Sequence, residues 1–122
     1  MRALVMGRIN EAWSQATSDE KRKKFWPAFI QLHKRWKDLG AQLLGTIDDS
    51  ILMVGAPTQR HFTFYELYEV PDIETIQKML EIVRHSDEED VNFYKYLRFE
   101  VIIGKPVAEE AEAFWKEAKE QD

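Results

Sequence analysis

The first half of the chain alternates apolar and polar positions in a way that predicts a strand followed by a long helix. Residues 3–9 are mostly apolar and bounded by charge, which indicates a short strand. Thr17, with Glu20 three residues later, forms a capping box, so a helix starts there and residues 10–16 are expected to form a loop. Apolar residues then recur at helical spacing and predict a buried stripe: Phe25, Phe29, Leu32, Trp36 and Leu39.

Pro27 and Gly40 indicate where this helix bends or ends. Proline lacks an amide hydrogen and clashes with the preceding turn, so Pro27 predicts a kink, or a helix ending near Trp26 and a new one starting at Pro27. Gly40 is typical of a left-handed C-cap. The apolar residues after it, 41–47, indicate a second strand.

The second half predicts two further strands, each followed by a helix. Residues 61–70 and 93–103 are rich in aromatic and branched side chains on both sides of the predicted strand. Between them, Asp72 is a good N-cap for an amphipathic helix that ends near His85. After Pro106 a last amphipathic helix is expected, whose apolar face must pack on the domain or on a partner.

This order of elements, βαββαβ plus a tail helix, predicts an α+β fold of ferredoxin-like type. In such a fold two helices cover one face of a four-stranded antiparallel sheet. We expect residues 1–105 to form that domain and residues 106–122 to form the C-terminal helix. Bulky residues on both sides of the last two strands would leave an apolar second face, so a homodimer through the sheet face is expected.

The same order of elements resembles the dimeric α+β barrel superfamily, which includes small monooxygenases, lactone isomerases and polyketide cyclases. The resemblance covers roughly residues 1–105 and implies the fold, but no particular reaction. A narrower resemblance, to small companion proteins of indole-acetate catabolism, lies in Tyr65-Glu66-Leu67-Tyr68-Glu69-Val70-Pro71-Asp72, in Arg98-Phe99-Glu100 and in Gly104-Lys105-Pro106. It implies a role in the catabolism of an aromatic acid.

Composition and charge narrow the possibilities. The chain has 122 residues, no cysteine and a net charge of −5, which disfavours a nucleic-acid surface and excludes disulfide and thiolate chemistry. The basic run at residues 21–24 is interpreted as a solvated helix face rather than as a phosphate contact. Neither a signal segment nor a membrane-length apolar stretch is found, so a cytoplasmic protein that binds no membrane is expected.

The sequence lacks the common catalytic motifs: phosphate loop, dinucleotide fingerprint, nucleophile elbow and HExxH pair. The histidines, His33, His61 and His85, do not have the spacing of metal ligands, so we predict neither a metal site nor a cofactor. Heme enters only as a trait of the resembled superfamily.

Charged groups on covered sheet faces are costly unless they are paired or functional, which draws attention to Glu66 and Arg98. In the functional interpretation Arg98 binds a substrate carboxylate, and Glu66 or His33 moves a proton, with Tyr65 or Tyr96 donating a hydrogen bond. The alternative is a structural ion pair between Arg98 and a glutamate at the barrel or dimer interface.

The remaining candidates would line a pocket for a planar apolar ligand. His33, Glu66 and Tyr96 are the predicted catalytic residues, and the predicted substrate-binding residues are Arg98, Trp13, Trp36, Tyr65 and His61. Trp13, in the expected loop, is the candidate lid. The alternative for the aromatic residues is that they fill the core, and for His33 and His61 that they are ordinary surface or helix-flank histidines.

Three hypotheses for the function follow. The first is an isomerase, cyclase or cofactor-independent oxygenase acting on an aromatic or polyketide-like carboxylic acid, in a pocket between sheet and helices. The second is a non-catalytic protein that binds such a metabolite or assists a catabolic pathway. The third is a structural domain whose interior is filled by its own side chains.

Overall fold

The computed structural model describes residues 1–52, 54–55, 62–86, 91–107 and 109–120. Four strands are found in these residues: β1 (Arg2–Ile9), β2 (Gln42–Asp48), β3 (Phe64–Glu69) and β4 (Leu97–Gly104). The helices are α1 (Glu11–Gln15), α2 (Ser18–Glu20), the π-helical turn η1 (Lys21–Phe25), α3 (Trp26–Asp38), α4 (Ile73–Arg84), α5 (Phe93–Tyr96) and α6 (Glu109–Glu120).

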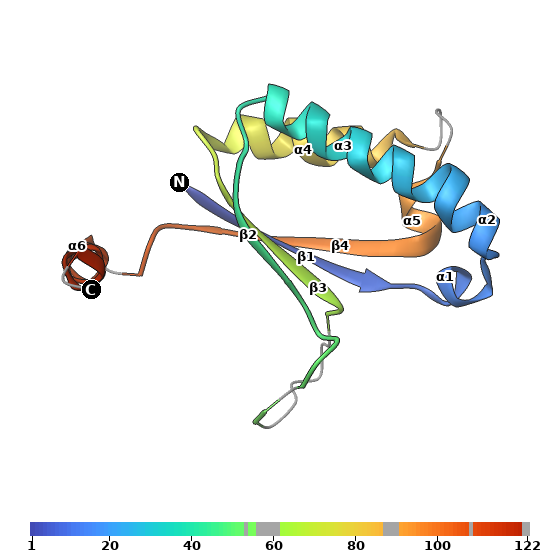
Figure 1. Ribbon diagram of the computed structural model, residues 1–122. Coiled ribbons are helices and arrows are strands. Elements are labelled where there is room, and N and C mark those ends of the chain that lie inside the picture. Colours follow the sequence, from blue (N-terminus) through green and yellow to red (C-terminus); the bar gives the residue numbers. More distant parts are fainter. Residues whose placement is uncertain (53, 56–61, 87–90, 108, 121–122) are drawn as a thin grey trace.

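The strands form one antiparallel sheet in the order β2-β3-β1-β4. Helices α3 and α4 lie side by side over one face of this sheet (Figure 1). The predicted α+β class with a four-stranded antiparallel sheet is therefore confirmed, and the arrangement is consistent with a ferredoxin-like fold.

The long helical segment begins and ends where the sequence predicts. The Thr17 hydroxyl accepts a hydrogen bond from the Glu20 amide at 3.1 Å. Gly40, at φ 102°, closes the C-terminus in a Schellman arrangement, in which its amide bonds the Lys37 carbonyl and the Ala41 amide bonds the Trp36 carbonyl. At Pro27 the structure comes close to the second expectation: the π-helical turn ends at Phe25 and a new helix, α3, begins at Trp26 with Pro27 in its first turn.

The core lies between the sheet and the two helices. Its fully buried side chains include Val5, Trp36, Met79 and Val83. Packing is closest at Gly7, where a methyl group would come within 2.1 Å of the Phe64 ring. The buried side chains thus come from the sheet and from both helices.

Two local predictions are wrong. Residues 11–15 form α1 rather than a loop. Residues 93–96 form the helical turn α5 rather than the start of the last strand, because the Asn92 side chain caps the Tyr94 amide and turns the backbone. Tyr96 therefore does not share a strand face with Arg98. The strand predicted over 61–70 is present at 64–69, and His61 lies outside the described residues.

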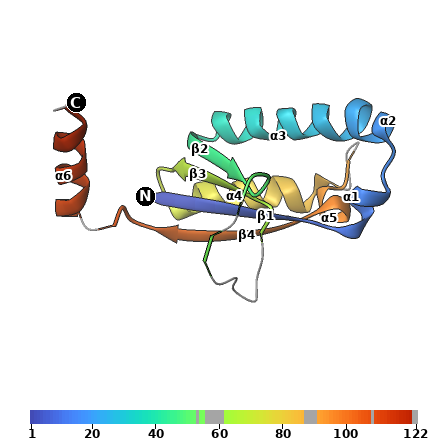
Figure 2. The same ribbon diagram turned by 60° about the horizontal axis from the view of Figure 1, so that its bottom comes forward.

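The second face of the sheet carries no helix. Leu4 on β1 and its cross-strand partners Leu67 and Ile102 point to this open face, and so do Met6 and its partner Tyr65. At the end of β4 the chain leaves the sheet, and α6 stands apart from the rest of the domain (Figures 1 and 2). The predicted C-terminal helix is confirmed; the surface on which it packs stays a prediction.

Candidate functional site

One cluster of polar side chains lies under α3, on the helix-covered face of the sheet. Glu66 of β3 is only 5% exposed, and its Oε2 lies 2.8 Å from Nε2 of His33 on α3. The Tyr68 hydroxyl donates to Glu66 Oε1 at 2.9 Å. His33 Nδ1 lies 2.7 Å from the Phe29 carbonyl oxygen. Strand phase brings Glu66 and Tyr68 to one face, and the buried stripe of α3 brings His33 above them.

The hydrogen bonds define the charge state of His33. A carbonyl oxygen only accepts, so Nδ1 must carry a proton, and Nε2 donates to the carboxylate when the ring is an imidazolium. Burial alone would lower the pKa of His33, but the hydrogen bond and charge of Glu66, with the Phe29 carbonyl, raise it above its ordinary value of 6.5. Burial and Glu66 also raise the pKa of Tyr68.

This charge state limits what the cluster can do chemically. An imidazolium with both N–H groups bonded has no lone pair with which to take a proton from a substrate. In this arrangement His33 and Glu66 form a partly buried ion pair. The Tyr68 hydroxyl donates a further hydrogen bond to the same carboxylate. Of the predicted catalytic residues, the structure thus joins His33 and Glu66, while Tyr68 is a member that the sequence interpretation did not name.

Tyr96 and Trp13 lie together at another place, near the start of the long helix. The Tyr96 hydroxyl donates to Glu20, whose carboxylate also lies 3.6 Å from Lys95 Nζ. Trp13 packs edge-on against Phe25, with ring centroids 4.6 Å apart, and against Tyr96. The structure does not place Tyr96 next to His33. Trp13, on α1, belongs to an aromatic cluster with Phe25 and Tyr96.

Trp36 lies beside the His33 cluster, but it is buried. Its ring centroid is 5.2 Å from that of His33 and 5.7 Å from that of Tyr68. Its indole N–H donates to the Met79 carbonyl at 3.0 Å, which ties α3 to α4. These contacts give Trp36 a structural role in the core.

Arg98 and Tyr65 lie on the open face of the sheet. Arg98 stands directly opposite Arg8 on β1, and neither guanidinium has an ion-pair partner among the residues that the structure describes. Like charges in facing positions of neighbouring strands repel each other. Both side chains are exposed, so water screens this repulsion.

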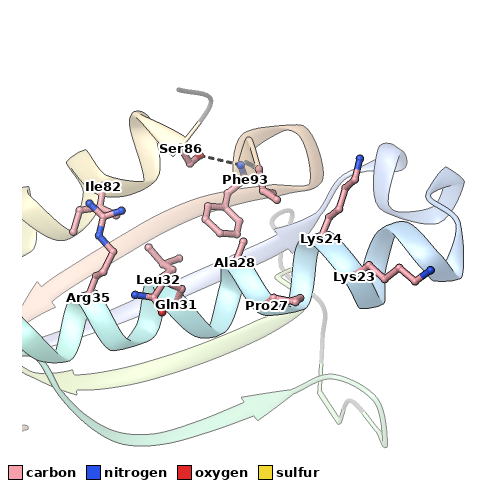
Figure 3. Close-up of a pocket in the computed structure, with 11 residues that line it drawn as sticks. Lys23, Lys24, Pro27, Ala28, Gln31, Leu32, Arg35, Ile82, Ser86 and Phe93 are labelled. Atoms are coloured by element: carbon pink, nitrogen blue, oxygen red, sulfur yellow. Dashed lines mark hydrogen bonds between the residues drawn. The ribbon is translucent and has the colours of Figure 1, made fainter. Parts of the chain in front are cut away.

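A groove of about 470 Å³ lies between α3 and the segment that carries α4 and α5. Its floor is apolar and includes Leu32, Phe93 and Ala28, while Lys24 of η1 and Arg35 of α3 extend at its two ends (Figure 3). The remaining lining residues are Lys23, Pro27, Gln31, Ile82, Ser86 and Val91. The Lys24 and Arg35 positions are eleven residues apart, which is roughly 16 Å along a helix.

The sequence interpretation missed this groove, although a charge signal pointed to it. The helical segment 18–38 carries seven Lys or Arg against three Asp or Glu, in a chain whose net charge is −5. The segment thus has an excess of positive charge. The basic run 21–24, interpreted as a solvated helix face, supplies two of the cations that line the groove, Lys23 and Lys24. Which cations face α4 could be known only from the packing of α3.

Other kinds of site find no support in the described part of the chain. No group of three or more His, Asp or Glu side chains there could hold a metal ion. Among the same residues, no helix has the length and apolar character needed to span a bilayer.

The fold and these sites define a small α+β protein with a ferredoxin-like sheet, one polar cluster and one cation-rimmed groove. Comparison of the chain with protein-family models, curated proteins and solved structures finds no significant match. The resemblance to the dimeric α+β barrel superfamily and to the indole-acetate companion proteins therefore stays a prediction.

Proposed function

We propose that this protein binds a small carboxylic acid with an apolar body in the groove between α3 and α4, without converting it. The observation that carries the proposal is the groove itself, with its apolar floor and a cation at each end. Its volume of about 470 Å³ suits a small organic molecule, and pockets of this kind combine apolar walls with a few polar anchors.

The charge distribution supports an acidic ligand. Lys24 can bind a carboxylate through a charge-assisted hydrogen bond, and Arg35 adds positive charge at the other end of the groove. Between the two cations, Phe93 and Leu32 offer apolar contact to the body of the ligand. An aromatic or branched acid matches both features.

The test is a titration calorimetry series of aromatic and aliphatic carboxylic acids, each paired with its neutral amide. We expect the acids to bind and the amides to bind at least tenfold more weakly. Lys24→Gln should weaken binding of the acid by roughly tenfold, the loss of one charge-assisted hydrogen bond. Ala28→Phe, which fills the floor, should abolish binding.

Lys37→Gln is the matched control, because Lys37 lies on α3, which continues directly from η1, but does not line the groove. Equal affinity for acid and amide, or equal loss of affinity in the Lys24 and Lys37 variants, would refute the proposal.

A second candidate function, an acid-assisted isomerase or cyclase, is favoured by the buried Glu66. A carboxylate at 5% exposure that is held by His33 and Tyr68 is a costly arrangement, and such groups gather at catalytic sites. In this alternative the His33 imidazolium donates a proton to a substrate that displaces its bond to Glu66. Turnover of an acid that binds, lost in His33→Gln with binding unchanged, would establish it.

We also propose that two copies of the chain pair through their open sheet faces. Leu4, Leu67 and Ile102 stand in register across three strands, so the exposed apolar surface is continuous. A continuous apolar face of this kind is rare on monomers.

A further inference from the structure

Three elements of the fold meet at the Lys24 end of the groove. Lys23 and Lys24 belong to η1, Ala28 and Leu32 to α3, and Phe93 to α5 (Figure 3). A ligand whose carboxylate is bound by Lys24 and whose apolar body contacts Phe93 therefore touches η1 and α5 at once. The groove keeps its shape only while these two elements stay in place relative to each other.

The segment 18–25, formed by α2 and η1, is attached to α5 by two kinds of contact. The Phe25 ring packs edge-on against the rings of Phe93 and Tyr96, with centroids 5.8 Å and 5.5 Å apart. The Tyr96 hydroxyl donates a hydrogen bond to the carboxylate of Glu20. Helix α5 is thus both a wall of the groove and the anchor of the segment that carries Lys24.

Neither side of this attachment has much stability of its own. Helix α2 has three residues, η1 five and α5 four, and such short helices depend on their packing. The α5 side is held by Ser86, whose Oγ accepts a hydrogen bond from the Phe93 amide at 3.0 Å. The segment 18–25 is held to α5 by the charge-assisted Glu20–Tyr96 bond in addition to the Phe25 ring. Loss of this bond should raise the fraction of molecules in which the segment has separated from α5.

Glu20 and Tyr96 themselves do not line the groove. Tyr96 is uncharged, because burial and the Glu20 carboxylate raise its pKa above the ordinary value of 10.0. Its hydroxyl therefore adds no charge to the groove. Any effect of this hydroxyl on a ligand must act through the positions of η1 and α5.

We propose that the Glu20–Tyr96 bond is a positioning element of the groove: it holds η1 on α5, and the affinity for the acid rises with the fraction of molecules in which this contact is formed. The coupling is reciprocal, so a bound acid in turn holds the segment 18–25 on α5. This inference rests on the binding of an acid in the groove, as proposed above.

The first measurement is the affinity of full-length Tyr96→Phe protein for the acid that the native protein binds most tightly in the calorimetry series. We expect its dissociation constant to rise roughly threefold to tenfold, although no residue that lines the groove has changed. Tyr94→Phe is the matched control, because Tyr94 lies on the same helix and is 43% exposed. It should bind as the native protein does. Equal affinity of Tyr96→Phe and the native protein would overturn the inference.

A second readout follows the segment itself. Trypsin cleaves after lysine and arginine, and the basic run 21–24 lies in the segment. The rate of such cleavage follows the population of locally opened molecules. We expect a saturating concentration of the acid to slow cleavage at 21–24 several-fold, and Tyr96→Phe without the acid to speed it several-fold. Cleavage after Lys116 on α6, which stands apart from the groove, should change in neither case (Figure 1).

The outcomes separate this inference from the proposed function. An acid that binds but leaves cleavage at 21–24 unchanged, measured by peptide mass, overturns the coupling and leaves the proposed function in place. Unchanged cleavage in Tyr96→Phe means that the bond does not hold the segment, and it overturns the inference as well. Failure of every acid in the series to bind the native protein refutes the proposed function and this inference together.

Discussion

The two faces of the sheet handle charge in different ways. On the helix-covered face, the carboxylate of Glu66 is buried, but two donors from the same chain, His33 and Tyr68, surround it. On the open face, Arg8 and Arg98 stand opposite each other without a described ion-pair partner, beside apolar residues that water reaches. The first face is complete within one chain. On the second face, both guanidinium groups are exposed to water.

On the helix-covered face, the largest loss of stability is expected from removing the Glu66 carboxylate. Glu66→Ala leaves the His33 imidazole and the Tyr68 hydroxyl without their acceptor, and we expect a loss of about 3–5 kcal/mol in the free energy of unfolding. Urea denaturation measures it. The double variant His33→Leu/Glu66→Leu should recover most of the loss, since no unpaired charge remains. A Glu66→Ala cost below 1 kcal/mol would mean that the pair is not formed in solution.

On the open face, the corresponding change is Ile102→Glu. A buried glutamate at the centre of paired sheets is uncompensated, so we expect the dimer dissociation constant to rise at least about a hundredfold, with the monomer still folded. Sedimentation velocity across a concentration series measures this change. Ile73→Glu is the matched control, because Ile73 is 50% exposed and Ile102 56%, but Ile73 lies at the start of α4. Equal association of the two variants would argue against pairing through this face.

Gly7 and Gly104 should differ in how well they tolerate an added methyl group. Gly7→Ala forces the Phe64 ring to move, because the added methyl would come within 2.1 Å of it, and we expect destabilisation of about 1–3 kcal/mol. At Gly104, on β4, a methyl group meets nothing within 4 Å. Gly104→Ala should therefore be neutral or slightly stabilising. Thermal unfolding of the two variants tests the contrast, and equal midpoints would contradict it.

The smallest expected effect is a dependence on pH. The pKa of His33 is raised in the folded state above its unfolded value of 6.5. Its contribution to stability is thus fully present below about pH 6.5 and is lost as the pH rises through the raised pKa, at up to about 1.4 kcal/mol per pH unit. Urea unfolding from pH 6 to pH 9 should show this fall in the native protein but not in His33→Gln. If the stability of the native protein and that of His33→Gln fall equally with pH, the His33–Glu66 ion pair is not the cause of the fall.

Much of the fold could be predicted because its signals are local. Thr17, Gly40 and Asp72 begin or end helices through bonds to residues only a few positions away, and each acts where it was expected to. The error at α5 has a local cause too. In residues 93–96, aromatic side chains alternate as they do in a strand, and the Asn92 cap that turns this segment was overlooked.

The sites were harder to predict, because they depend on register and packing. His33 and Glu66 were both candidates, but their pairing across 33 residues requires the position of α3 over β3. Arg8 carries no signal within its own segment, since only the pairing of β1 with β4 places it opposite Arg98. The groove depends on which side of α3 meets α4. Long-range contacts of this kind leave no pattern within a single segment.

The π-helical turn Lys21–Phe25 also has a consequence for how the molecule opens. The Trp26 amide bonds the Lys21 carbonyl five residues back, and Pro27 contributes no amide hydrogen, so the backbone ladder is weakest at this joint. The segment before the joint is held by the buried Phe25 and by the bond between Glu20 and Tyr96. We therefore expect the amides of residues 18–25 to exchange hydrogen by local opening, while those of residues 28–38 exchange only when the whole domain unfolds.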